Sequence, residues 1–166
     1  CFIIHARIAV LAGLSPKQNR EIPPLDYERV FAIKERFPDL EIVINGGIKT
    51  LEESRHLLEN VDGVMIGREA YQNPNLLARV DQQLFDSDYP VMSQEDVLAQ
   101  FIDYAKNELR QGTALKNMTR HVLGLFQGQP GAKRFRRYLS ENAHKQDAGI
   151  DILETAGRLV LNSNSL

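Results

Sequence analysis

The sequence contains only one cysteine, Cys1, among its 166 residues. A single cysteine cannot form an internal disulfide, and it cannot build a zinc site from cysteines. Long apolar runs are also missing, because none approaches the roughly 20 residues needed to span a bilayer. The first residues lack the basic stretch and long apolar stretch of a signal peptide. Together these absences favour a cytoplasmic protein.

Acidic residues are absent from Leu109 to Ser140. The same window contains seven basic residues: Arg110, Lys116, Arg120, Lys133, Arg134, Arg136 and Arg137. Because the whole chain has a net charge of −2, the remainder carries a charge of −9. A basic segment on an acidic protein can bind phosphates, or it can be a solvated helix face. Composition alone does not choose between these interpretations.

The overall composition is that of a folded globular protein, with 43% hydrophobic and 25% charged residues. A chain of this length can bury one sizeable core or two small ones. It begins at Cys1 and enters an apolar stretch at once. Since a natural terminus is seldom a buried strand, we expect a fragment of a longer chain.

Three short apolar runs predict buried strands, at residues 2–4, 41–44 and 63–66. Each run is followed by a pattern typical of a helix. Strands that are apolar throughout and alternate with helices indicate a parallel sheet buried on both faces. We therefore read residues 1–85 as three βα units.

Helix signals separate the strands. Asp26 can cap a helix that is stopped by Pro38, and Thr50 with Glu53 forms a capping box for the next helix. A short helix and a further one after Pro74 follow the third strand. The loop over residues 7–25 is much longer than the roughly 2–6 residues usual between a strand and a helix, so we expect it to be functional.

Strand signals vanish beyond a linker at residues 86–92. Ser93 can cap a helix that ends near residue 109. Further helices are predicted over 115–126, 132–143 and 150–161. Residues 93–166 are therefore expected to form a helical domain with a frayed tail.

Glycines follow the second and third strands, as Gly46, Gly47 and Gly67. Glycine lets the backbone approach a ligand closely, and the helix starts that follow offer free N–H groups. In TIM barrels a phosphate site is commonly built after strands seven and eight, which would make residues 2–4 the sixth strand. The alternative is that these glycines only serve tight turns.

Three polar residues flank this candidate phosphate site. Arg68 could pair with a phosphate, Asn45 offers a donor and an acceptor at a strand end, and His5 ends the first strand, where barrel enzymes place catalytic groups. Asn45 could equally be a turn residue, and His5 a structural histidine. The other histidines show no metal-ligand spacing, and no zinc, P-loop or Rossmann fingerprint is present.

At these residues the sequence resembles a known family. The matching segments include Ile44-Asn45-Gly46-Gly47-Ile48 and Thr119-Arg120-His121. The others are residues 2–7, 13–27, 62–74, 124–128, 130–132 and 136–140. Together they closely resemble the bacterial tRNA-dihydrouridine synthases, subfamily A, over nearly the whole chain. Ile8 and Val10 depart from the pattern, since lysine and tryptophan are expected there.

The resemblance implies the fold and the cofactors. The fold class would be α/β followed by all-α: the last three βα units of a TIM (β/α)8 barrel, incomplete here, and a C-terminal helical bundle. Residues 1–85 would belong to an FMN-binding barrel and residues 93–166 to a tRNA-binding domain. The implied FMN contacts are His5, Asn45, Gly46, Gly47, Gly67 and Arg68. NADPH would reduce the flavin.

The resemblance also implies the substrate and the reaction. The expected RNA contacts are Lys17 and Arg20 in the long loop, and Lys133 and Arg136 in the basic helix. The flavin would give a hydride to C6 of a D-loop uridine, at positions 20 and 20a, and a cysteine would protonate C5. That cysteine belongs to a part of the family pattern that precedes this chain, and Cys1 does not match it. No catalytic residue is therefore expected in this fragment, which should be inactive alone.

Two other interpretations remain open. One is a different phosphate-binding FMN barrel that acts on a small molecule, which leaves the basic window unexplained. The other is a non-enzymatic RNA-binding module. Because three strands cannot close a barrel, we also expect the sheet edge and inner face to be covered, for example by self-association.

Overall fold

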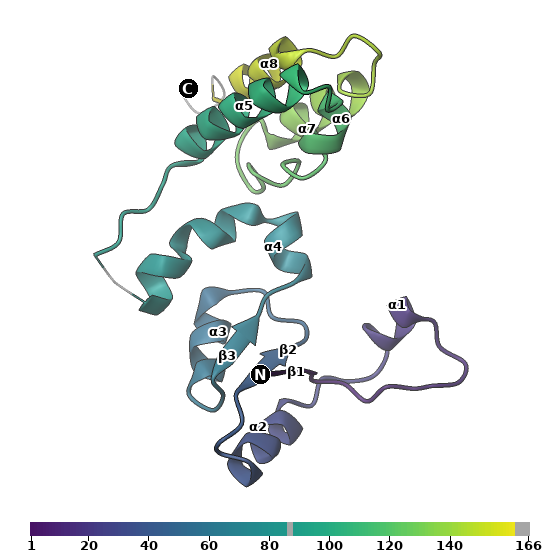
Figure 1. Cartoon of the computed structure of the whole chain (residues 1–166), viewed down its shortest axis with the longest axis vertical. Coiled ribbons are helices and arrows are strands. Elements are labelled where there is room, and N and C mark those ends of the chain that lie inside the picture. The colour runs from purple at the N-terminus through teal and green to yellow at the C-terminus, as the bar shows by residue number, and fades with distance from the viewer. Residues whose placement is uncertain (86–87, 162–166) are drawn as a thin grey trace. The chain divides into compact units, whose positions relative to one another are not determined.

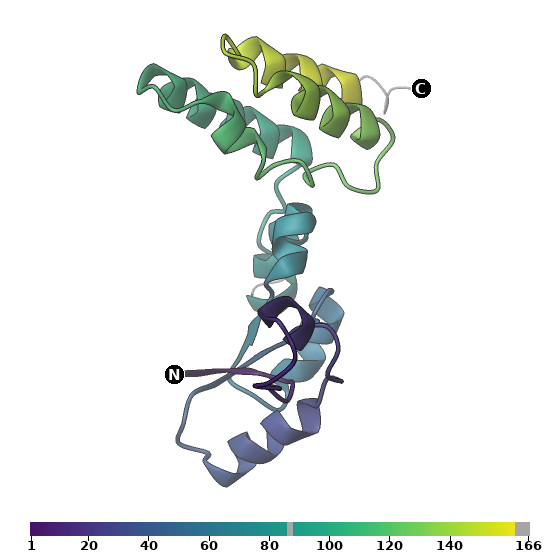
Figure 2. The same cartoon turned by 90° about the vertical axis from the view of Figure 1, so that its right-hand side faces the viewer.

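The computed structural model describes residues 1–85 and 88–161. Its residues form two compact units, Cys1–Glu69 and Ala70–Leu166. The first unit contains three parallel strands with helices, and the described part of the second is helical (Figures 1 and 2). The predicted mixed architecture with three parallel strands is therefore confirmed.

The two units meet in sequence at Glu69 and Ala70, earlier than the linker expected at residues 86–92. Residues 86–87 of that linker lie outside the described residues. The boundary is early because the segment after Glu69 packs within the second unit. The ring of Tyr71, for example, lies 5.6 Å from the ring of His121, centroid to centroid.

The sheet has the order β1 (Phe2–His5), β2 (Ile42–Asn45), β3 (Gly63–Met65). Both strand pairs are parallel, which requires a crossover between the strands of each pair. The crossovers contain α2 (Tyr27–Arg36) and α3 (Leu51–Leu58), respectively. The chain thus follows the predicted βαβαβ order.

One face of the sheet is covered by these helices. Ile42 and Ile44 of β2 are 1% and 0% exposed, and they share a core with Val30 of α2 and Leu57 of α3. Ile3 on β1 is 54% exposed. The sequence predicted a sheet buried on both faces, whereas in the described residues of this unit only the helix side is covered.

Three helices begin at the predicted caps. The side chains of Asp26, Thr50 and Ser93 accept hydrogen bonds from backbone N–H groups three residues further on, at 3.0–3.1 Å. These bonds satisfy amides that the first helical turn leaves without a partner. The predicted capping box differs in one detail, because the Glu53 carboxylate accepts from the N–H of Lys49 at 3.0 Å.

Residues after β3 form a series of short helical segments. They are α4 (Arg68–Gln72), the 3-10 helix η1 (Pro74–Arg79) and the π-helix η2 (Asp81–Phe85). The sequence predicted one helix after Pro74. The structure instead has two short segments there, the more tightly wound 3-10 helix η1 followed by the more loosely wound π-helix η2.

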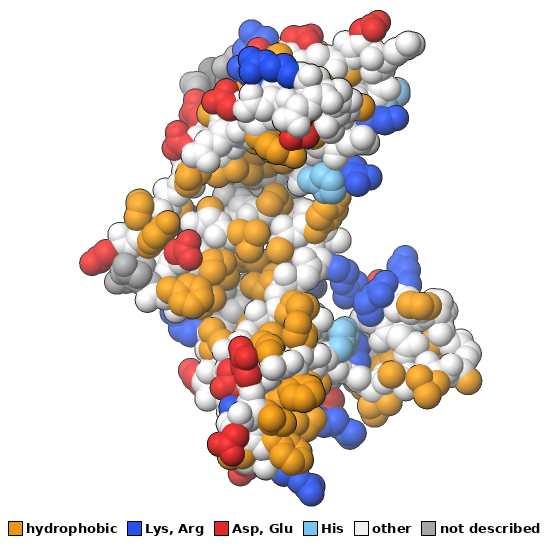
Figure 3. All heavy atoms as spheres, viewed as in Figure 1, with side chains coloured by type: hydrophobic (Ala, Val, Ile, Leu, Met, Phe, Trp, Pro, Cys, Tyr) orange, Lys and Arg blue, Asp and Glu red, His pale blue; other side chains and the backbone are white. Residues whose placement is uncertain are grey.

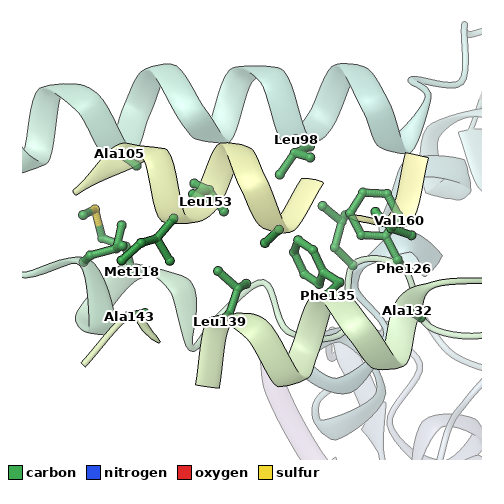
Figure 4. Close-up of a cluster of buried hydrophobic side chains, with 14 residues drawn as sticks. Leu98, Ala105, Met118, Phe126, Ala132, Phe135, Leu139, Ala143, Leu153 and Val160 are labelled. Atoms are coloured by element: carbon green, nitrogen blue, oxygen red, sulfur yellow. The ribbon is translucent and has the colours of Figure 1, made fainter. Parts of the chain in front are cut away.

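The helical unit, Ala70–Leu166, also contains α5 (Gln94–Arg110), α6 (Leu115–Thr119), α7 (Ala132–Asn142) and α8 (Ile150–Leu161). Its core draws side chains from all four helices and from the segment between α6 and α7 (Figure 4). Phe126 and Phe135 meet edge to face with ring centroids 5.0 Å apart. The expected frayed tail, residues 162–166, lies outside the described residues.

The predicted helix over residues 115–126 is wrong in length, because α6 ends at Thr119. The Thr119 hydroxyl donates to the carbonyl of Leu115 at 3.1 Å, a local bond that competes with helix continuation. Beyond it, backbone bonds span three residues, as from the N–H of Val122 to the carbonyl of Thr119. The chain therefore continues in tight turns up to α7.

Within the described residues, no helix is long and apolar enough to cross a membrane.

Candidate functional site

Polar side chains meet at the carboxyl edge of the sheet. His5 ends β1 and pairs in register with Asn45, which ends β2 and pairs in turn with Met65. Side chains alternate along a strand, so His5 lies on the same face as Ile3 and opposite the helix-covered face. Both His5 and Asn45 are half-buried. The structure therefore brings these two predicted site residues together on the open face of the sheet.

The surroundings of His5 favour its neutral imidazole form. Burial is the main cause that lowers the pKa of His5 below its usual 6.5, and the positive charges of Arg7, Arg20 and Arg68 lower it further. A neutral imidazole has one N–H donor and one acceptor nitrogen. His5 can therefore hydrogen-bond a neutral polar group, such as a ring edge, without adding a charge.

The turn after β2 has a backbone that favours glycine. Gly46 and Gly47 have φ angles of 134° and 71°. A Cβ on Gly47 would lie 2.7 Å from Leu25, at the end of the long loop, and the Tyr27 hydroxyl donates to the Gly46 carbonyl at 2.6 Å. The glycine turn is therefore fixed by contacts within the protein.

The turn after β3 is different. Gly67 is exposed, and a Cβ added to it would meet nothing within 4 Å. Neither a positive φ angle nor a close neighbour therefore requires glycine at position 67. The open space leaves room for a ligand to approach the main chain. Arg68 follows and forms an ion pair with Glu21 of the long loop, Nη1 to Oε1, at 3.2 Å.

The long loop contains an unpredicted short helix, α1 (Pro16–Asn19). Ser15 and Gln18 form a reciprocal capping box, with the Ser15 hydroxyl accepting from the Gln18 N–H and the Gln18 side chain accepting from the Ser15 N–H. Lys17 and Arg20 are exposed on this segment. Figure 3 shows basic side chains gathered over α1.

The base of the loop is anchored to the sheet. Arg7 donates to the carbonyl of Pro23 and forms a backbone bridge with Leu25. Further out, the Asn19 side chain accepts from the N–H of Val10 at 2.7 Å and donates to its carbonyl at 2.9 Å. The loop thus presents Lys17 and Arg20 on a defined framework.

The basic helix α7 has one buried and one charged side. Phe135 and Leu139 are 0% and 1% exposed and form the buried face of the helix. Lys133 and Arg136 are exposed, three residues apart on the helix surface. Arg137 is paired at 2.7 Å with Glu141, a carboxylate just beyond the acid-free window. The free positive surface of α7 is therefore smaller than the sequence indicated.

Cys1 is exposed and unpaired, and no group of three or more potential metal-ligating side chains occurs in the described ranges 1–85 and 88–161.

A family model described as "Dihydrouridine synthase (Dus)" matches residues 1–161. The chain belongs to the dihydrouridine synthase family. The match covers both the sheet unit and the described helices of the second unit.

Curated relatives agree with the family. The chain is 59% identical over 155 residues to a "tRNA-dihydrouridine(20/20a) synthase" of Vibrio cholerae, which covers 93% of this chain and 47% of the relative. It is 58% identical over 159 residues to the protein of that name from Escherichia coli K12, a match that covers 96% of this chain and 46% of the relative. It is 56% identical over 159 residues to the protein of that name from Yersinia pestis, again covering 96% of this chain and 46% of the relative. The chain therefore spans about half the length of the curated relatives it matches.

In this dihydrouridine synthase family member, the predicted residues fall into two groups. His5, Asn45 and the glycine turn lie at one sheet edge, while Lys133 and Arg136 belong to the separate helical unit. The sequence interpretation missed Glu21 and Tyr27. Both lie in the matching segment 13–27, but the resemblance assigned them no role, and no pattern signals an ion pair between a loop glutamate and Arg68.

Proposed function

We propose that the whole protein is a tRNA-dihydrouridine synthase, which reduces D-loop uridines at positions 20 and 20a to 5,6-dihydrouridine with NADPH and FMN. The observation that carries this proposal is the 56–59% identity to relatives of that name over 93–96% of the chain. Identity this high, extending through the sheet unit and the helical unit alike, supports a shared substrate.

The three βα units would be the last three of a (β/α)8 barrel. Two features support this. Helices cover one face of the sheet and leave the other for the barrel interior, and His5 and Asn45 lie at the carboxyl edge, where barrel enzymes place their sites. In this arrangement residues 1–85 bind the flavin and also supply the loop that contacts tRNA, while residues 93–166 form the tRNA-binding helical domain.

The residues present fit FMN. Arg68, with its planar fork of donors, and the N–H groups near Gly67, Gly46 and Gly47 would hold the phosphate. The open space at Gly67 supports close approach there. His5, neutral, and Asn45 would hydrogen-bond the polar edge of the ring system. When bound, the flavin supplies hydride transfer between NADPH and the uridine ring.

The chain's own residues orient the ligands rather than supply a proton. Cys1 precedes β1, so the four residues of the strand separate it from the carboxyl edge by roughly 13 Å. We therefore assign it no catalytic role. The target base must leave its stack to reach a flavin at this edge.

RNA contacts are proposed on both units. Lys17 and Arg20 would bind tRNA phosphates beside the carboxyl edge, and Lys133 and Arg136 would bind them on the helical unit. All four side chains are exposed, and α7 is firmly seated through Phe135. Such contacts release counterions, so affinity falls as salt rises.

The test replaces Lys133 and Arg136 together by alanine in the whole protein. We expect weaker tRNA binding and a log–log salt slope flatter by roughly one to two units, because about 0.7–0.9 units are lost per phosphate contact. NADPH oxidation by the flavin in the absence of tRNA should be unchanged. The matched control replaces the exposed Lys145 and Arg158 by alanine. This double variant removes the same amount of positive charge, but outside α7.

Equal effects of the two double variants would show that only net charge matters and would reject the α7 contact. Dihydrouridine formation on tRNA, measured by loss of uridine at positions 20 and 20a, tests the activity itself. A parent protein that oxidises NADPH but leaves tRNA unmodified would refute the proposed function.

A further inference from the structure

The helical unit contains a surface cleft of about 540 Å³. Of the residues that line it, only Arg136 has been assigned a role in the proposed function. Its lining residues come from the end of α4, the turns after α6, and α7. They are Tyr71, Gln72, Arg120, Leu123, Gly124, Gln127, Gly128 and Arg136. The volume lies in the range of about 300–1,000 Å³ typical of small-molecule sites. A single nucleotide is a ligand of this scale, whereas an RNA duplex is too wide.

The cleft has a fixed wall. A Cβ on Gly124 would lie 1.9 Å from the carbonyl oxygen of Gln72, so only glycine allows the two backbone segments to pass this closely. The ring of Tyr71 packs edge to face on His121, with an interplanar angle of 83°. The Tyr71 hydroxyl also donates to the carbonyl of Arg120 at 3.5 Å. Several contacts therefore hold the aromatic residue in place.

The cleft is positively charged. Arg120 and Arg136 both line it and both are exposed, while none of its eight lining residues is acidic. Arg120 uses its Nε to donate to Nε2 of His121 at 3.0 Å. A guanidinium has five donors in a planar fork. The bond through Nε orients Arg120 and does not involve its two terminal amino groups. Two guanidinium groups on one cleft favour an anion with several oxygens, such as a phosphodiester.

An aromatic ring adds a second element of recognition. The side chain of Tyr71 is 55% exposed even though contacts fix it. Exposed aromatic rings beside arginines are the combination that binds unpaired nucleotides, because every base can stack on a ring while the phosphate pairs with the cation. A paired base in a helix cannot use such a ring, because both of its faces are already stacked.

We propose that this cleft binds one unpaired nucleotide of the RNA, its phosphate held by Arg120 and Arg136 and its base stacked on Tyr71. The inference rests on the proposed function and deepens it, since it assigns a loop or bulge nucleotide to the helical unit, where the basic helix would otherwise contact backbone phosphates only.

The test measures tRNA affinity over a range of salt for the whole protein and four variants, of which Lys133→Ala reports on the α7 contact outside the cleft. Arg120→Gln should weaken binding about 10-fold to 150-fold, as for hydrogen bonds to charged groups, and flatten the salt slope by about 0.7 units. Tyr71→Leu keeps apolar bulk but removes the stacking face, and should weaken binding roughly 5-fold to 150-fold with the salt slope unchanged. The matched control, Arg158→Gln on α8, should bind as the parent does.

Thermal unfolding of each variant separates a loss of binding from a loss of folding. If Tyr71→Leu unfolds, the affinity of Arg120→Gln, whose parent side chain is exposed, tests the cleft assignment by itself. If Lys133→Ala weakens tRNA binding while Arg120→Gln and Tyr71→Leu do not, the cleft assignment is overturned and the proposed function stands. If the parent does not bind tRNA at all, the proposed function fails together with the cleft. A Tyr71→Leu effect that appears equally with a fully paired RNA duplex would also overturn the assignment.

Discussion

Arg68 and Glu21 lie 47 positions apart in the sequence, yet Nη1 of Arg68 donates a hydrogen bond to Oε1 of Glu21 at 3.2 Å. This pair joins the start of α4 to the loop that carries Lys17 and Arg20. Both side chains are about half exposed, and exposed ion pairs contribute only about 0–1 kcal/mol. The pair therefore orients Arg68 without holding it too strongly to bind a phosphate.

A first prediction separates the two partners of this pair. In the whole protein, Arg68→Ala should weaken FMN binding by about 1.5–3 kcal/mol, because it removes a charged hydrogen bond to the phosphate. Glu21→Gln breaks the same ion pair but should change flavin affinity by less than about 1 kcal/mol. Flavin fluorescence titration measures both. Equal losses in the two variants would mean that Arg68 acts through the loop rather than on the phosphate.

The second prediction compares two glycines with opposite surroundings. Gly67→Ala meets nothing within 4 Å and should leave the free energy of unfolding unchanged, while lowering flavin affinity if the ligand approaches the main chain there. Gly124→Ala places a Cβ on the carbonyl of Gln72 and should destabilise the fold by about 1–3 kcal/mol, as overpacking does. Denaturant unfolding and flavin titration of both variants provide the comparison. A stable Gly124→Ala protein would contradict the close backbone contact.

A third prediction concerns Tyr27, whose hydroxyl bonds the Gly46 carbonyl. Burial, followed by the nearby Glu53 carboxylate, raises the pKa of Tyr27 from 10 to about 12. Because the folded pKa is the higher one, the stabilisation is complete below pH 10 and is lost as pH rises towards 12. Tyr27→Phe should cost about 1 kcal/mol at neutral pH, and this gap to the parent should narrow between pH 10 and 12. Unfolding temperatures of both proteins across that range test it, and a constant gap would contradict the assigned cause.

The fourth prediction concerns His5. Its pKa lies below 6.5, chiefly through burial and then through three arginines, including Arg20. A lowered folded pKa means that stability present above pH 6.5 is lost as pH falls towards the folded value. Arg20→Gln should raise the pKa of His5 while leaving it below 6.5, because burial remains. Nuclear magnetic resonance titration of the imidazole measures this, and an unchanged midpoint in Arg20→Gln would rule out Arg20 as a cause of the lowered pKa of His5.

Much of the fold could be predicted because its signals are local. Asp26, Thr50 and Ser93 each precede an apolar helical pattern, and each accepts the expected capping bond. The three apolar runs became the three strands. Short helix α1 also had a local signal, the Ser15–Gln18 capping box with Pro16 between, but the sequence pattern was interpreted there as a loop over residues 7–25.

The remainder depends on contacts between distant residues. The helix expected over 115–126 stops at Thr119, where turns begin, and Gly124 further along passes close to Gln72. Arg137 seemed part of a free basic surface because its partner, Glu141, lies one residue beyond the acid-free window. The candidate site follows the same division. Strand ends predicted His5, Asn45 and Gly67, whereas Glu21 and the cleft around Tyr71 depend on tertiary packing.

The anchoring of the long loop separates two kinds of sequence change. Its base, where Arg7 bonds Pro23 and Leu25 packs on Gly46 and Gly47, is tied to the glycine turn, so a substitution there is transmitted to the sheet edge. Residues 8–22 are mostly exposed and make their hydrogen bonds among themselves, apart from the weak link through Glu21. Sequence changes confined to that tip can therefore leave unaltered the sheet edge at which we propose that FMN binds.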